Sequence, residues 1–158
     1  MIESDQMTHS DSFVATGDPG SSAPWQMLAS GERTGGIVSF GEAHLPPHTA
    51  GPGLHVHSRE DEAIFVIEGT LTFVVGERRF EAGSGSLVWL PRHIPHTFAN
   101  VGDEPVWTFG TITPAGLEGM FKEHAEYFAS LDGPPDEQRL AAISDKYGVQ
   151  RLGPPLEV

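Results

Sequence analysis

The sequence contains no cysteine, which excludes disulfide bonds and thiol catalysis and favours a reducing compartment. Basic residues are scarce: nine Lys and Arg stand against 22 Asp and Glu, for a formal net charge of −13. Without a basic stripe we expect no binding to nucleic acid or to an anionic membrane surface. Apolar runs are too short to span a membrane, and no basic start with an apolar core marks a signal peptide. We therefore expect a cytoplasmic protein.

The length of 158 residues fits one domain with a substantial core. Residues 1–22 are polar and rich in Ser, Asp and Gly, so we predict a flexible N-terminal tail there. We predict a β-barrel over residues 23–114 and a helical extension over residues 115–158, packed on the barrel or on a partner subunit. Because exposed strand edges are commonly buried by pairing, we expect a homodimer.

Short β-prone segments alternate with turn formers through the central part of the chain, which predicts an all-β antiparallel sandwich or barrel. The predicted strands are residues 24–28, 37–43, 63–67, 71–75, 78–81, 86–90, 97–99 and 106–113. Glu68-Gly69 and Gly76-Glu77 are typical of two-residue turns, so each predicts a hairpin between the strands beside it. Residues 45–53, with three prolines, are predicted to form a loop.

After Thr113 the apolar residues follow a helical spacing, which predicts an amphipathic helix. Its stripe consists of Leu117, Met120, Phe121, His124, Tyr127, Phe128 and Leu131. A second helix is predicted over residues 136–147, with Gly148 ending it. We interpret both helices as packed on the barrel exterior or on a neighbouring subunit, and His124 as a helix-surface residue. The alternative is a lid over the mouth of the barrel.

Three histidines and one glutamate have a spacing typical of a metal site. His55 and His57 lie two residues apart, so in a strand both rings point to the same face. Glu62 follows after four residues, beside an apolar run, and His96 begins a later β-prone run. Brought together, three imidazoles and one carboxylate form a nitrogen-rich pocket for a divalent first-row metal. A His-x-His pair alone is weak evidence for a metal site, so the spacing of the residues around it must be considered too.

The spacing of these residues and of the glycines, proline and asparagine near them resembles the two signature motifs of the cupin family. In this sequence the motif positions are His55, His57, Glu62 and Gly69, and then Gly85, Pro91, His96 and Asn100. The resemblance implies a jelly-roll β-barrel in which His55, His57, Glu62 and His96 are metal ligands. Two positions depart from the pattern, because His93 and Thr49 stand where the motifs have glycine. The first departure alters a turn and could add an imidazole near the pocket, but neither removes a ligand position.

Nitrogen and oxygen ligands without thiolate fit Fe, Mn, Co, Ni, Cu or Zn, one ion per chain. Calcium and magnesium prefer oxygen alone and are disfavoured. The resemblance to small single-domain cupins similar to quercetin dioxygenase implies a dioxygenase that acts on an aromatic or enol small molecule. Glu62 need not be a permanent ligand, because its position beside the metal also allows it to act as general base on a substrate hydroxyl. Two alternatives stay open: a redox-neutral metal-dependent cyclase or isomerase of polyketide or secondary metabolism, and a small-molecule-binding protein without turnover.

Other chemically active side chains carry weaker signals. His44 and His48, in or beside the proline-rich loop, could be supplementary ligands or acid–base groups, and we favour exposed loop histidines. Four aromatic residues on predicted strands could line an aromatic pocket, but core packing is the simpler interpretation of each. They are Phe65, Trp89, Phe98 and Trp107.

Overall fold

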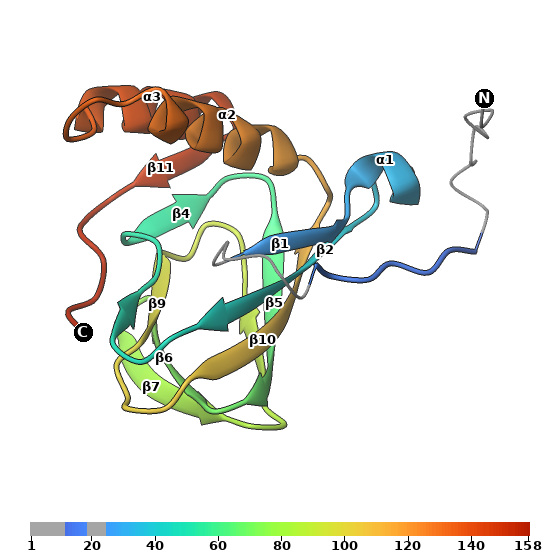
Figure 1. The fold of residues 1–158 in the computed structure, drawn as a ribbon, viewed down its shortest axis with the longest axis vertical. Coiled ribbons are helices and arrows are strands. Elements are labelled where there is room, and N and C mark those ends of the chain that lie inside the picture. The colour runs from blue at the N-terminus through green and yellow to red at the C-terminus, as the bar shows by residue number, and fades with distance from the viewer. Residues whose placement is uncertain (1–11, 19–24) are drawn as a thin grey trace.

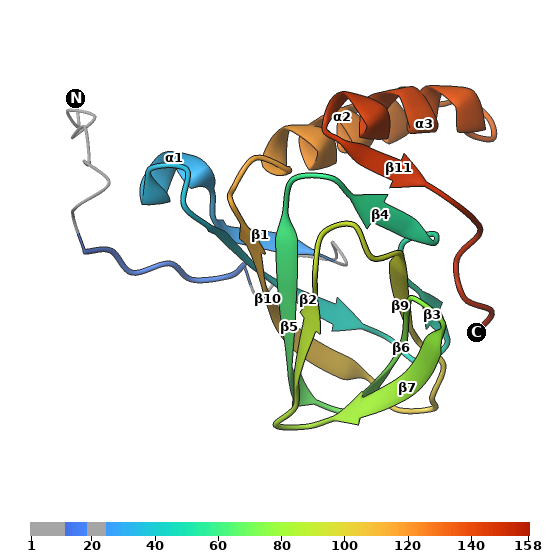
Figure 2. The same ribbon diagram turned by 180° about the vertical axis from the view of Figure 1, so that it is seen from behind.

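The computed structural model describes residues 12–18 and 25–158. Most of the predicted tail, including His9, lies outside these residues. The described part forms two antiparallel β-sheets that face each other as a barrel, with two helices across one end (Figures 1 and 2). The predicted all-β antiparallel barrel with two C-terminal helices is therefore confirmed. Among the described residues, no helix is both long enough and apolar enough to cross a membrane.

The first sheet has the strand order β1-β2-β10-β5-β8. Its strands are β1 (Gln26–Ala29), β2 (Ser39–Leu45), β5 (Asp61–Glu68), β8 (Leu87–Leu90) and β10 (Val106–Thr113). The second sheet has the order β11-β4-β9-β6-β7, and β3 also pairs with β9. Its strands are β3 (Thr49–Ala50), β4 (His55–His57), β6 (Thr70–Val75), β7 (Arg78–Gly83), β9 (His96–Asn100) and β11 (Val149–Arg151). The short strand β3 lies inside the segment predicted to be a loop.

The core lies between the two sheets, because every second residue of a strand points inward. Leu71, Phe73 and Leu90 are fully buried there. The same alternation turns Phe65 and Trp89 outward, where they are 39% and 52% exposed. Core packing was therefore the wrong prediction for these two aromatic residues, whose strand neighbours occupy the inner face instead.

The predicted hairpin across Glu68-Gly69 is wrong. Although β5 and β6 are consecutive, β5 pairs with β10 and β8, whereas β6 pairs with β7 and β9. The turn is the corner where the chain passes from one sheet to the other. Gly69 does have a positive φ of 84°, and a Cβ there would lie 2.5 Å from the carbonyl oxygen of Pro105. Local turn chemistry was predicted, but the pairing of the strands depends on the whole barrel.

The helices are α1 (Gly31–Thr34), α2 (Glu118–Ala129) and α3 (Glu137–Lys146), of which α1 was not predicted. Asp136 caps α3 by accepting hydrogen bonds from the backbone of Gln138 and Arg139. Gly148, with φ of 76°, ends this helical segment as expected. The chain then enters β11, which pairs with β4. This unpredicted strand brings part of the C-terminal extension into the barrel sheet.

An apolar cluster joins α2, α3 and β11 to the barrel. Ile112 of β10 packs in it with Leu117, Met120 and Val149. Figure 1 shows the result, since both helices lie across the end of the barrel that carries β4 and β11. The extension therefore covers the barrel of its own chain.

Candidate metal centre

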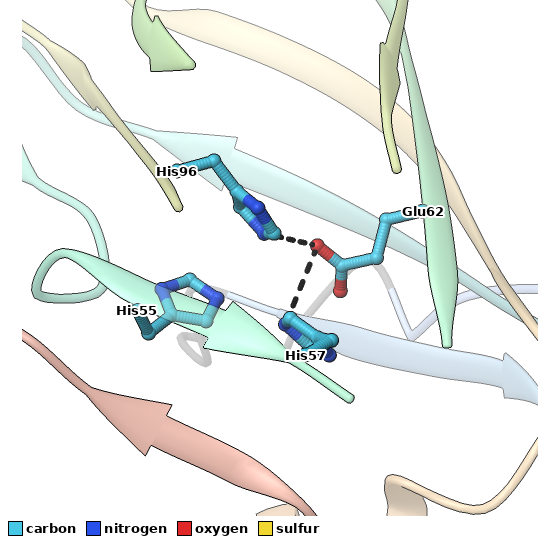
Figure 3. Close-up of side chains that lie close together, drawn as sticks. All are labelled: His55, His57, Glu62 and His96. Carbon is cyan, nitrogen blue, oxygen red and sulfur yellow. Dashed lines mark hydrogen bonds and ion pairs between the residues drawn. The ribbon is translucent and has the colours of Figure 1, made fainter. Parts of the chain in front are cut away.

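Four side chains from three strands converge inside the barrel (Figure 3). His55 and His57 are both buried on β4, as the two-residue spacing requires. Glu62 points inward from β5, and His96 begins β9 directly opposite His55. The structure thus brings together all four residues predicted from the sequence.

The ligand atoms of His55, His57, Glu62 and His96 all lie within 4.8 Å of one another. Atoms that share one transition-metal ion at about 2.1 Å are separated by about 3–4 Å. The Oε2 atom of Glu62 lies 3.2 Å from Nε2 of His96 and 3.9 Å from Nε2 of His57. The cluster therefore needs little contraction to coordinate an ion, and it could hold one.

Hydrogen bonds orient two of the rings. Nδ1 of His55 donates to the carbonyl oxygen of Gly53 at 2.8 Å, and Nδ1 of His96 donates to that of Ile94 at 2.9 Å. A carbonyl oxygen only accepts, so Nδ1 carries the hydrogen and Nε2 keeps its lone pair. Burial lowers the pKa of His55 to about 4, which keeps this imidazole neutral at pH 7.

The polar atoms in the cluster are incompletely satisfied, which is the observation that fits a metal. In the neutral tautomer set by Ile94, the Nε2 lone pair of His96 faces a carboxylate oxygen of Glu62 at 3.2 Å. Two lone pairs at this distance repel each other unless a proton or a metal cation lies between them. Both ring nitrogens of His57 are buried without a hydrogen-bond partner, and an ion would supply the partner of Nε2.

Glu60 is a buried carboxylate behind His57, with 4% exposure, that sequence analysis did not identify. Its Oε2 atom has no hydrogen-bond partner and lies 3.6 Å from Nδ1 of His57. Carboxylates behind a ligating imidazole commonly fix its tautomer and orientation. We infer the same positioning role for Glu60.

We expect Glu60→Ala to weaken metal binding by about 10–100-fold, because the ring of His57 loses the buried carboxylate that lies 3.6 Å from its Nδ1. Glu60→Gln keeps an acceptor oxygen and is the matched control, with a smaller loss. Competition with a chelating dye measures both affinities. Equal affinities for wild type and Glu60→Ala would contradict the positioning role.

Two further contacts hold the turn and the strand that carry His96. Asp61 accepts hydrogen bonds from the backbone nitrogen, Nε and Nη2 of Arg92 at 2.8, 3.1 and 2.6 Å. These bonds lower the pKa of Asp61 to about 2 and fasten the start of β5 to the turn before His96. At the other end of β9, the fully buried Asn100 donates to the carbonyl oxygens of Leu45, Pro46 and Glu104. Asn100 therefore supports the scaffold and not the metal.

The remaining candidate histidines lie away from the cluster. His44 is exposed and its ring stacks on Trp107, with ring centroids 5.2 Å apart. His48 is exposed in its turn and lies 3.0 Å from Asp103. His93 is exposed with φ of 66°, so it adopts the backbone conformation that glycine would have at this motif position. Both His44 and His48 are exposed, as favoured, but only His48 lies in a loop, because His44 belongs to strand β2.

A cavity of about 510 Å³ opens beside the cluster, within the size range of small-molecule sites. Its barrel wall includes His55, His57 and Glu62. Its helical wall is formed by Met120, Phe121, His124, Phe128, Leu140 and Ser144. The helices thus close over the barrel mouth, which is the lid arrangement that the sequence left as the alternative.

His124 therefore faces the cavity and is not the simple helix-surface residue that was predicted. The signal was present in the sequence, because His124 lies four residues from both Met120 and Phe128 on the apolar stripe of α2. Two other aromatic residues, Trp25 and Phe98, also line the cavity. Phe98 is thus the one of the four strand aromatics considered from sequence that reaches this space.

Residues 41–109, less than half of the chain, match the family model described as a cupin domain. Over 53 residues the chain is 28% identical to an uncharacterized protein, MJ1618, from Methanocaldococcus jannaschii. That alignment covers 34% of this chain and 42% of the relative, so the chain spans less than half of the length of the curated relative.

Solved structures share the same fold. A predicted oxalate decarboxylase from Thermotoga maritima matches with a TM-score of 0.54 and 22% identity over 57% of this chain and 78% of that one. KdgF from Halomonas sp. matches with a TM-score of 0.52 and 14% identity, over 60% and 80% of the two chains. The cupin domain of Cnp3 from Schizosaccharomyces pombe matches with a TM-score of 0.51 and 18% identity, over 60% of this chain and 63% of that one. Such identities show the fold alone.

The fold and the site together define a cupin-type β-barrel with a His/Glu cluster that could hold a metal ion. The match to the cupin model covers residues 41–109, and the solved structures add a shared fold.

Proposed function

We propose that the protein is a metal-dependent dioxygenase that acts on an aromatic or enol substrate. The observation that carries the proposal is the cavity, in which a three-histidine, one-carboxylate cluster opens into a space with aromatic walls. Trp25, Phe98, Phe121 and Phe128 offer flat apolar surfaces to a planar ligand. Such walls also exclude water from the reacting groups.

His55, His57 and His96 would hold a divalent ion, and Glu62 would complete its ligands or act as a base. When bound, a redox-active ion would supply a Lewis acid for substrate oxygens and a centre for dioxygen chemistry. Burial alone raises the pKa of Glu62, but the surrounding imidazoles outweigh it, so the net pKa lies below its ordinary value. Glu62 is then a carboxylate at neutral pH and can accept the proton of a substrate hydroxyl.

The test is oxygen uptake by protein loaded in turn with Fe, Mn, Co, Ni, Cu or Zn. With 3-hydroxyflavone as substrate, we expect oxygen consumption in proportion to product, and no product under anaerobic conditions. Elemental analysis of the purified protein identifies the resident metal, and zinc alone would argue against the oxygenase. Product formed at equal rates with and without oxygen would replace this proposal with the redox-neutral one.

A redox-neutral cyclase or isomerase is the second candidate. The observation in its favour is that the same cluster could polarise a carbonyl without oxygen. A solved structure described as a putative sugar phosphate isomerase from Acidithiobacillus ferrooxidans matches with a TM-score of 0.50 and 22% identity, over 56% of this chain and 57% of that one. A phosphate-bearing sugar fits this cavity poorly, because its one basic lining residue, Arg151, is paired with Glu137 at 3.0 Å. A polyketide-like aromatic or enol substrate is therefore preferred for this candidate too.

We also propose that the protein is located in the cytoplasm, which the absence of cysteine favours. We further propose that it forms a homodimer. Phe65 and Leu87 are register partners on neighbouring strands, and Trp89 lies beside them on the same outer face. Their exposures of 39%, 67% and 52% make this face apolar, as protein contact surfaces often are. We expect Leu87→Lys to weaken dimerisation about tenfold or more in sedimentation equilibrium. A monomeric wild-type protein would contradict the proposal.

A further inference from the structure

The imidazole of His124, on the helical wall of the cavity, is held in place by two residues of the same wall. Nε2 of His124 lies 3.4 Å from the carbonyl oxygen of Leu140 and 3.5 Å from Oγ of Ser144. Ser144, which is 2% exposed, donates its own hydroxyl hydrogen to the same carbonyl at 3.1 Å. These contacts link α2 to α3 and fix the imidazole at the cavity wall.

The contacts also set the chemistry of the ring. A carbonyl oxygen only accepts, so Nε2 of His124 carries a hydrogen and donates it to Leu140. In the uncharged ring the other nitrogen, Nδ1, is then a bare acceptor. No described residue forms a hydrogen bond with this Nδ1 atom. His124 lines the cavity, and its Nδ1 is not among the buried side-chain atoms that lack a partner, so a ligand donor can reach this acceptor.

The neighbouring groups indicate which ligand donor fits. The rest of the helical wall is largely apolar and aromatic, with Phe121 and Phe128 from the same helix as His124. Arg151 lines the cavity as well, but its guanidinium is engaged by the carboxylate of Glu137. An uncharged hydroxyl group on an aromatic ring suits this wall better than a carboxylate or a phosphate does.

We propose that His124 is a specificity residue, whose Nδ1 accepts a hydrogen bond from a phenolic hydroxyl on the part of an aromatic ligand that faces the helices. The ligand class rests on the proposed function, in which substrate oxygens lie at the metal cluster. The C-terminal helices then select the substrate in addition to closing the barrel. A ligand that lacks this hydroxyl leaves the acceptor buried and unpaired, which costs affinity.

Two pairs of compounds test the proposal by titration calorimetry: flavone with 4′-hydroxyflavone, and 3-hydroxyflavone with 3,4′-dihydroxyflavone. Each pair differs only in the distant hydroxyl, and the first pair lacks the metal-binding 3-hydroxyl group. Zinc-loaded protein allows binding to be measured without oxidative turnover. For wild type we expect the 4′-hydroxyl to strengthen binding about five- to tenfold in both pairs.

The variants separate a specific hydrogen bond from a packing effect. His124→Phe keeps a ring but removes the acceptor, so the gain from the 4′-hydroxyl should fall to none. His124→Asn places an amide oxygen near the position of Nδ1 and should restore part of the gain. His44→Phe, at an exposed histidine away from this cavity, is the matched control and should keep the full gain. Metal content and circular dichroism verify that each variant is folded.

The outcomes distinguish this inference from the proposed function. A gain that depends on His124 in the flavone pair, without turnover of 3-hydroxyflavone by any metal-loaded form, supports the inference and refutes the dioxygenase. Turnover of 3-hydroxyflavone without a gain that depends on His124 supports the dioxygenase and refutes the inference. The inference is overturned if the gain persists in His124→Phe, if this variant weakens both members of a pair equally, or if wild type binds none of the four compounds.

Discussion

Replacing His96 with alanine is expected to remove stoichiometric metal from the protein while the barrel remains folded. His96 is 1% exposed, its Nδ1 is fixed by Ile94, and its Nε2 lies 3.2 Å from Glu62. Loss of a residue that only orients a ligand costs about 10–100-fold in metal affinity, and loss of the ligand itself should cost more. Elemental analysis after dialysis, together with thermal melting followed by circular dichroism, measures both parts of the prediction.

The matched control is His93→Gly, three residues earlier, in the turn that precedes β9. His93 is exposed, lies outside the cluster and has a positive φ of 66° that glycine adopts without strain. We expect this variant to keep its metal and to be at least as stable as wild type. Normal metal content in His96→Ala, or loss of metal in His93→Gly, would refute the assignment of His96 as a ligand. His55→Ala should behave as His96→Ala does.

The elements that sequence predicted best are those in which local spacing alone decides the geometry. His55 and His57 share a face because strand side chains alternate, and this needs no knowledge of the partner strand. The strand Val106–Thr113 has the bounds that were predicted, since its period-two burial is complete from end to end. The meeting of His96 with His55 of β4 came from the motif resemblance, because no local rule joins residues 41 positions apart.

The errors arise where tertiary contacts override local patterns. Gly69 was assigned to a hairpin because a positive φ does not reveal which strands pair on either side of a turn. The strand Val149–Arg151 has only three residues, too few for a periodic signal, and it forms because β4 offers an unpaired edge. Glu60 lacks a motif position altogether, and only burial against His57 distinguishes it from a solvent-exposed acid.

The helical lid changes how the central glutamate is expected to act. Glu62 lines a cavity that α2 and α3 wall on one side, so under the proposed function it would accept a substrate proton within a mainly apolar space. A carboxylate whose pKa lies below its ordinary value stays ionised there, and the hydrogen bond with His96 contributes most to lowering that pKa. Glu62 would thus have two functions that can be tested separately, metal binding and proton transfer.

The variant Glu62→Gln separates metal binding from proton transfer. Glutamine has the same shape and an amide oxygen that can still ligate an ion, but it cannot take up a proton. We expect the variant to bind metal with reduced affinity and, per bound ion, to turn over substrate about 10²–10⁴-fold more slowly. The measurement is the initial rate at saturating metal, divided by the metal content of the same sample.

Glu60→Gln is the matched control, since it neutralises another buried carboxylate two residues away that does not line the cavity. Its rate per bound ion should remain close to that of wild type, even where its metal affinity is lower. Near-normal turnover by Glu62→Gln would show that its carboxylate is a ligand and not the base. An equal loss of rate in both variants would show that negative charge near His57, and not proton transfer by Glu62, controls the reaction.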